Sequence, residues 1–72
     1  MEIPEPLIDL ERAAETERAK LAGLDGDEYT AQRRVWRAAA AVFQQAVTAH
    51  AAEAGVARHL LEQAVKHAVR HP

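Results

Sequence analysis

The sequence predicts an all-helical fold, and three observations support this. β-Branched residues are few and scattered among the 72 residues, whereas alanine occurs 17 times. No stretch alternates apolar and polar residues with a period of two, which is the pattern of a half-buried strand. Apolar residues instead recur every three or four positions, as they do in amphipathic helices. We therefore expect an all-α protein without strands.

A first helix is expected over about residues 6–22. Pro4-Glu5-Pro6 marks its start, because proline suits the first helical turn and acidic residues complement the positive end of the helix dipole. Gly23 is placed where a left-handed cap would end the helix, and residues 23–27 form the strongest turn signal in the chain. The apolar face of this helix consists of Ile3, Leu7, Leu10, Ala14 and Leu21, with Glu17 in its middle.

A second helix is expected from about residue 27, capped by Asp25 or Asp27. Its apolar face keeps the same phase past Gly55, and no Ser, Thr, Asp or Asn follows that glycine to cap a new helix. This continuity favours one helix over about residues 27–70, in which the glycine costs about 1 kcal/mol without ending it. A short first helix and a long second helix then form an antiparallel hairpin.

The alternative is a break at Gly55, with Val56 in a Schellman motif and a third helix from residue 57 or 58. A continuous helix outruns the first helix and exposes an apolar stripe, which predicts a homodimer that forms a helical bundle. A break instead closes the same contacts inside a monomeric three-helix bundle. The two forms are related by domain swapping with Gly55 as the hinge. The core or dimer face is expected to contain Trp36, Phe43, Val47, His50, Leu60, Leu61, Ala64, Val65 and Ala68.

The composition excludes several kinds of active site. The absence of cysteine removes thiol catalysis, zinc fingers and iron–sulfur clusters, and the absence of serine removes nucleophilic triads. No glycine-rich phosphate loop and no HExxH or paired ExxH motif occurs. His67 and His71 have the i, i+4 spacing of a metal pair, but they lie on the last turn before Pro72. We expect no enzyme, no catalytic residue, no cofactor and no metal.

The sequence also bears on cellular location. The longest uninterrupted apolar run is Ala38–Phe43, far short of the roughly 20 residues that a membrane span needs. Residues 1–10 lack the basic and apolar regions of a signal peptide. Together with the absence of cysteine, this predicts a cytoplasmic protein without membrane contact.

Charge is distributed unevenly along the chain. Residues 1–28 hold nine acids and three bases, a net charge of −6, whereas residues 29–72 hold six bases and two acids, a net charge of +4. The simplest interpretation is that an acidic first helix packs beside a basic second helix. Alternatively, Arg33, Arg34 and Arg37 contact the phosphates of a nucleic acid. A pI near 6.0 and the lack of aromatic residues among these bases make nucleic-acid binding the weaker hypothesis.

Two polar residues on the apolar faces receive specific hypotheses. Glu17 is expected to form a structural ion pair with Arg33 across the hairpin. His50 lies near the middle of the long second helix, so an antiparallel dimer would bring its two copies to the two-fold axis. Protonation would then place like charges together, and the dimer should loosen as the pH falls through about 6.

The strings AKLAGLDGDEY, AVTAHAAEAG and EQAVKHAVRH resemble those of small uncharacterised helical proteins of actinobacteria, Streptomyces in particular. The resemblance covers most of the chain and implies no activity, cofactor or partner. We therefore expect a non-enzymatic helical module that self-associates as a homodimer or binds another helical protein. The alternative is a small regulator that contacts nucleic acid through the arginines of the second helix.

Overall fold

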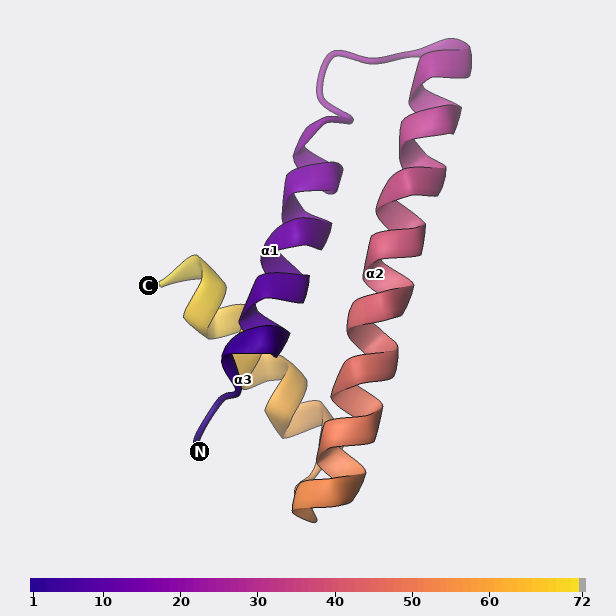
Figure 1. Ribbon diagram of the computed structural model, residues 1–72. Coiled ribbons are helices and arrows are strands. Elements are labelled where there is room, and N and C mark those ends of the chain that lie inside the picture. The colour runs from indigo at the N-terminus through magenta and orange to yellow at the C-terminus, as the bar shows by residue number, and fades with distance from the viewer. Residues whose placement is uncertain (72) are drawn as a thin grey trace.

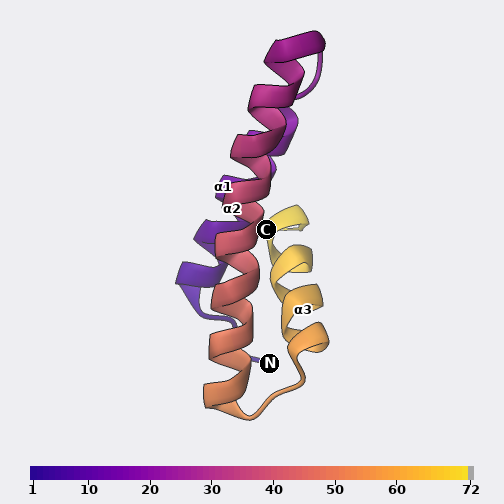
Figure 2. The ribbon, with the colours of Figure 1, turned by 90° about the vertical axis from the view of Figure 1, so that its right-hand side faces the viewer.

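The computed structural model describes residues 1–71, which form three helices: α1 (Glu5–Ala19), α2 (Gly26–Ala54) and α3 (Arg58–Arg70). This part of the chain contains no strand, so the all-α class is confirmed. α1 and α2 lie side by side and run in opposite directions (Figure 1). α3 turns back at the end of α2 and crosses behind the lower part of the α1–α2 layer at an oblique angle (Figure 1 and Figure 2). The molecule is elongated, with extents of 43 × 23 × 17 Å.

Local sequence accounts for both ends of α1. Pro4 is the N-cap, a second proline follows in the first turn, and Glu5 places a negative charge at the positive end of the dipole. The helix ends at Ala19, three residues before the expected end. The Leu21 N–H bonds the Arg18 carbonyl three residues back, which tightens the last turn into 3₁₀ geometry. Gly23 then adopts φ 83°, and the chain reverses into α2.

α2 ends at Ala54, which corrects the expectation of one continuous helix over residues 27–70. Gly55 adopts the left-handed conformation, with φ 67° and ψ 33°. The N–H groups of Gly55 and Val56 both bond the carbonyl of Ala51, as in a Schellman motif. The break lies where the alternative interpretation had placed it, and α3 begins at Arg58 without a side-chain cap.

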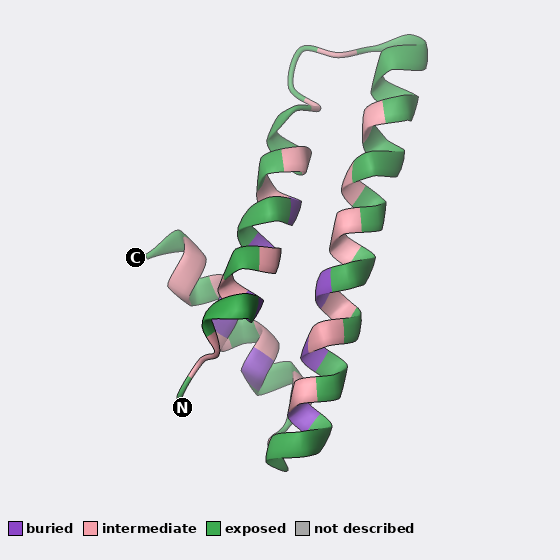
Figure 3. Cartoon of the chain, viewed as in Figure 1, coloured by how far each residue is buried: buried purple, intermediate pink, exposed green. Residues whose placement is uncertain are grey.

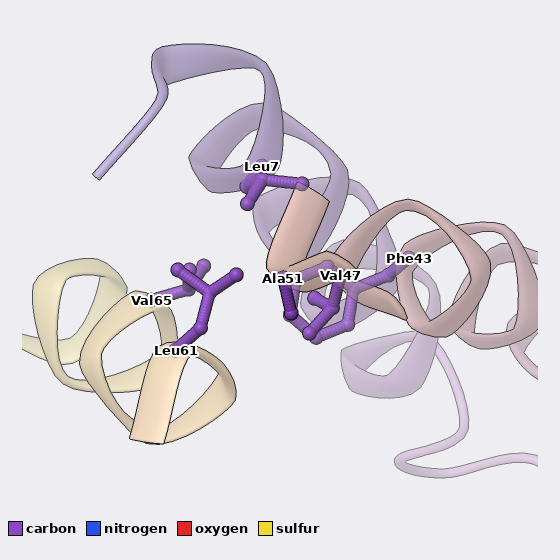
Figure 4. Packing of buried hydrophobic residues seen from close by; sticks show 6 residues of the cluster. All are labelled: Leu7, Phe43, Val47, Ala51, Leu61 and Val65. Atoms are coloured by element: carbon purple, nitrogen blue, oxygen red, sulfur yellow. The ribbon is translucent and has the colours of Figure 1, made fainter. Parts of the chain in front are cut away.

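The core is formed where all three helices meet. Figure 4 shows Leu7 of α1, three residues of α2 and two residues of α3 converging on one cluster. Phe43, Val47, Leu61 and Val65 are the largest fully buried side chains. Buried positions gather in the part of the hairpin that α3 covers, whereas the other part carries only half-buried and exposed positions (Figure 3).

This core uses most of the face that was expected to bind a second copy of the chain. Phe43, Val47, Leu61 and Val65 are buried within one chain, and Ala64 and Ala68 are half-buried. The structure therefore corrects the expectation of an exposed apolar stripe beyond the end of the first helix. Of the residues expected at that face, Leu60 remains exposed, and Trp36 and His50 are half-buried.

Adjacent leucines on α3 test this packing. Leu61 is 1% exposed and Leu60 is 49% exposed. We predict that Leu61→Ala lowers the free energy of unfolding by about 2–5 kcal/mol, which approaches the total stability of about 3–5 kcal/mol usual at this size. Leu60→Ala is the matched control and should change it by less than about 0.5 kcal/mol. Urea unfolding followed by circular dichroism measures both, and equal losses would contradict the docked position of α3.

Candidate interaction surface

Polar side chains form a network along the seam between α2 and α3. The Gln44 amide donates a hydrogen bond to Glu62 at 2.6 Å, and the Arg58 guanidinium donates to the Thr48 hydroxyl at 2.9 Å. Arg58 also donates to the Gln44 side-chain oxygen and forms an ion pair with Glu62 at 3.2 Å. These bonds fix the angle at which α3 crosses α2, because they join the first turns of α3 to successive turns of α2.

The same network changes the acidity of Glu62. The Gln44 hydrogen bond, opposed in part by desolvation and reinforced by Arg58 and Lys66, lowers the pKa of the Glu62 carboxyl from its usual value of 4.5. The charged form of this carboxyl group is therefore favoured more strongly in the folded chain than in the unfolded one.

A second polar contact joins α3 to α1 beside the core. Glu11 is buried, and its carboxylate lies 3.3 Å from the Lys66 ammonium. The ammonium also lies 5.7 Å from the centroid of the Phe43 ring. Burial of a charge is costly unless an opposite charge accompanies it, so this pair makes the docking of α3 specific for α1.

Glu17 lies at the α1–α2 interface, but it does not pair with Arg33. Its carboxylate accepts a hydrogen bond from the Gln32 amide at 2.8 Å and forms an ion pair with Lys20 at 2.9 Å. Gln32 also donates to the Glu17 backbone carbonyl at 2.7 Å. The Gln32 hydrogen bond is the largest of the causes that lower the pKa of Glu17, ahead of the hydrogen bond and the charge of Lys20. The correction has a simple geometric reason: Arg33 is rotated by about 100° from Gln32, which takes its side chain away from α1.

The part of the hairpin in which no residue is fully buried is the candidate interaction surface. We call residues 15–37 the open half of the hairpin. No residue between Ala14 and Phe43 is fully buried. Trp36 is half-buried there, and the nearby Tyr29 is 40% exposed. Trp36 precedes Phe43 by seven residues, two helical turns, so it lies on the side of α2 that α3 covers lower down.

The open half carries charges of both signs. Arg33 and Arg37 precede Gln44 by eleven and seven residues, so they lie on the side of α2 that faces α3 further along the helix. Both are exposed, and neither forms an ion pair within residues 1–71. On the α1 side, Glu15 pairs with Arg18 at 2.9 Å. The hydrogen bond of this pair lowers the pKa of Glu15 most, and the nearby charges of Lys66 and Arg70 lower it further, so Glu15 lies at the edge of the region that α3 covers. Arg34 is exposed as well, but it points away from this side of α2.

His67 and His71 lie at the end of α3, whereas His50 lies beside the N-terminal residues. His67 and His71 bring their rings to 4.6 Å, and in the described residues no group of three or more His, Cys, Asp or Glu side chains could hold a metal ion. His50 lines an open, mostly apolar pocket with Pro4, Val56 and the N-terminal residues. Pro72 lies outside the described residues. Within residues 1–71 no helix is both long enough and apolar enough to cross a membrane.

Comparison with known proteins adds no functional information. The chain matches no protein-family model, no curated protein and no solved structure.

Two residues of the α3 docking site were missed by sequence reasoning. Glu11 lies between Leu7 and Ala14 at i+4 and i−3, so the spacing alone could have placed it on the buried face. Lys66 gives no such signal, because its position over α1 depends on the fold-back at Gly55.

The lowered pKa of Glu62 predicts an acid-sensitive docking of α3. Because the folded pKa lies below the unfolded value, the stabilisation is present above about pH 4.5 and is lost as the pH falls through the folded pKa. The free energy of unfolding should fall as the pH drops from neutral to acidic. We predict that Glu62→Gln makes this fall smaller, by an amount below about 1 kcal/mol. Urea unfolding across this pH range measures the difference. Glu53→Gln is the control, because Glu53 is exposed and forms no ion pair in residues 1–71, and an equal effect of both changes would contradict the network.

The partner of Glu17 can be tested by a titration. We predict that Gln32→Ala raises the pKa of Glu17 toward 4.5, since the Gln32 hydrogen bond is the largest cause of its lowering. Arg33→Ala should leave this pKa unchanged. Carbon-detected NMR of the Glu17 carboxyl gives both values, and a rise only with Arg33→Ala would restore the ion pair that the sequence had suggested.

Proposed function

We propose that the chain is a non-enzymatic helical module that self-associates, and that a second copy packs on the open half of the hairpin. The observation that carries this proposal is the half-buried state of Trp36 in a segment where no residue is fully buried. An indole contributes most when it is enclosed, and two helices alone enclose it on two sides only. A second hairpin placed on the open half completes a four-helix layer around Trp36.

The charges of the open half favour a second copy of the chain as the partner. A two-fold contact uses the same patch on both copies, so the patch must be complementary to itself. The α2 side of the open half carries Arg33 and Arg37, and the α1 side carries Glu15. A two-fold axis near Trp36 that lays α1 of each copy on α2 of the other brings these opposite charges together.

Small size supports the same conclusion. Chains of this length usually reach only about 3–5 kcal/mol of stability from one core, and oligomerisation is a common way to add to it. The chain has no cysteine for a disulfide, and its described residues form no metal cluster. Additional burial at the open half therefore supplies stability that this chain has no other strong means to obtain.

Nucleic-acid binding through Arg33, Arg34 and Arg37 is the second candidate. The observation in its favour is that all three side chains are exposed and that none forms an ion pair within residues 1–71. Arg34 separates the two candidates, because it points away from the open half but would contribute to a phosphate-binding surface.

Light scattering and Trp36 fluorescence test self-association. We predict that the mass rises with concentration from 7.9 kDa toward twice that value, while Trp36 emission shifts to the blue as the indole loses water. Trp36→Ala should weaken association by about thirtyfold or more, because truncation of a central Trp costs about 2 kcal/mol or more. A mass that stays at one chain up to millimolar concentration would refute the proposal.

Matched variants define the surface. Val42→Ala removes apolar area from an exposed residue outside the open half and should leave association unchanged. Arg37→Ala should weaken association and Arg34→Ala should not. If nucleic acid is the true partner, a gel shift that declines steeply with salt will weaken with both arginine changes.

A further inference from the structure

We propose that α3 exchanges between two copies of the chain. In the exchanged form α2 and α3 of each copy straighten at Gly55 into one helix, and each α3 occupies the docking site on the other copy's α1 and α2. This inference goes beyond the self-association proposed above, because it uses the α3 docking site and leaves the open half uncovered.

The first support is the link between α2 and α3. It spans only Gly55, Val56 and Ala57, and Gly55 is the one residue of this link with positive φ. The bonds that close the turn run from the N–H groups of Gly55 and Val56 to the Ala51 carbonyl. The Gly55 bond already has the i to i−4 spacing of a regular helix. Of the two bonds, a straight helix moves only that of the Val56 N–H, from the Ala51 to the Ala52 carbonyl, so these backbone groups stay paired in both forms. Because the link is short, α3 can fold back only onto the adjacent part of its own chain.

The second support is the register of the apolar residues across the link. Leu61 follows Phe43 by 18 residues and Val65 follows Val47 by 18 residues, which is five helical turns of 3.6 residues. A straightened helix therefore carries the α2 and α3 core residues on one continuous face. Such a face is what two antiparallel helices require in order to cover each other across a two-fold axis near Gly55.

The third support is the direction of α3. In the single chain α3 turns back from the end of α2 and crosses the α1–α2 layer obliquely, so that it contacts both helices (Figure 1 and Figure 2). In the proposed exchange the partner copy's α3 occupies this site at the same angle. The docking site thus receives an α3 of the same sequence in the same orientation, whichever chain supplies it.

The fourth support is that α3 docks through contacts that can form between chains. The Glu11 carboxylate of α1 meets the Lys66 ammonium of α3 at 3.3 Å. The bond from Gln44 to Glu62 and the bond from Arg58 to Thr48 likewise join α2 to α3. Exchange preserves each of these contacts together with the burial of Leu61 and Val65. The two forms differ chiefly at the link and in concentration dependence.

Charge reversal of the Glu11–Lys66 ion pair tests exchange directly. Glu11→Lys alone places two positive charges at the docking site, and Lys66→Glu alone places two negative charges there. When the two variants are mixed, each exchanged dimer contains one chain of each kind. At one docking site the unchanged Lys66 of the first variant meets the unchanged Glu11 of the second. At the other site the two substituted residues meet, and their charges are again opposite. We expect each variant alone to be destabilised, and the mixture to form a one-to-one dimer with a higher melting temperature than either variant.

The outcomes of mixing separate the two proposals. Contact through the open half alone does not bring Lys66 of one chain to Glu11 of another, so it gives no gain on mixing. If the mixture melts as the sum of its components, α3 does not exchange, and self-association through the open half is unaffected. If a variant alone is unfolded, recovery of helical circular dichroism on mixing supports exchange and its absence overturns it. The double variant Glu11→Lys with Lys66→Glu is the control, because it restores the pair within one chain.

Substitution at the hinge gives an independent measurement. Gly55→Ala should raise the association constant of the exchanged dimer by about a hundredfold or more, because alanine disfavours the left-handed turn and favours the straight helix in both chains. Gly55→Asn is the matched control, since asparagine tolerates left-handed backbone and is a weak helix former. Light scattering at matched concentrations should show more dimer for Gly55→Ala than for the parent chain. Equal masses for the two would overturn the proposal.

Discussion

The left-handed turn at Gly55 is the constraint on which the structure depends. It directs α3 back onto the hairpin, where Leu61 and Val65 meet Phe43 and Val47. Without this turn, α1 and α2 would form a two-helix layer with one side of its apolar surface exposed to water. A single residue with φ 67° thus determines whether the core is completed by the chain itself. Glycine suits the position because it adopts positive φ without the steric cost that a Cβ brings.

The length of α3 sets where the interaction surface lies. α3 has 13 residues and α2 has 29, so α3 contacts only part of its neighbour. The ion pair between the buried Glu11 and Lys66 and the seam around Gln44 fix this overlap at one end of the hairpin. At the other end Trp36 stays half-buried. Because α3 docks at one end of the hairpin, the side chains at the other end are not fully buried.

The sequence predicted the helical class and the turn between α1 and α2, but it could not decide the role of Gly55. Because 18 residues make five helical turns, Leu61 falls in phase with Phe43 in a continuous helix, while in the folded-back form it reaches the same core from the opposite direction. Periodicity is therefore the same for both topologies. Helical periodicity could have placed Gln32 on the side of α2 that faces Glu17. The contact between Lys66 and Glu11 could not be predicted in this way, because it depends on how α3 folds back. The spacing of apolar residues therefore indicates which face of a helix is buried, but it does not indicate which other helix covers that face.

The two proposed modes of association have different symmetry consequences when they are combined. A two-fold contact between the open halves of single chains closes after two copies, because each chain has one such surface. Exchange of α3 instead joins two chains near Gly55 and leaves an open half at each far end. Contact between open halves of exchanged dimers would then continue from one dimer to the next. The conformation of Gly55 determines how the core closes, and under the two proposals it would also determine whether self-association stops at a dimer or extends into a chain.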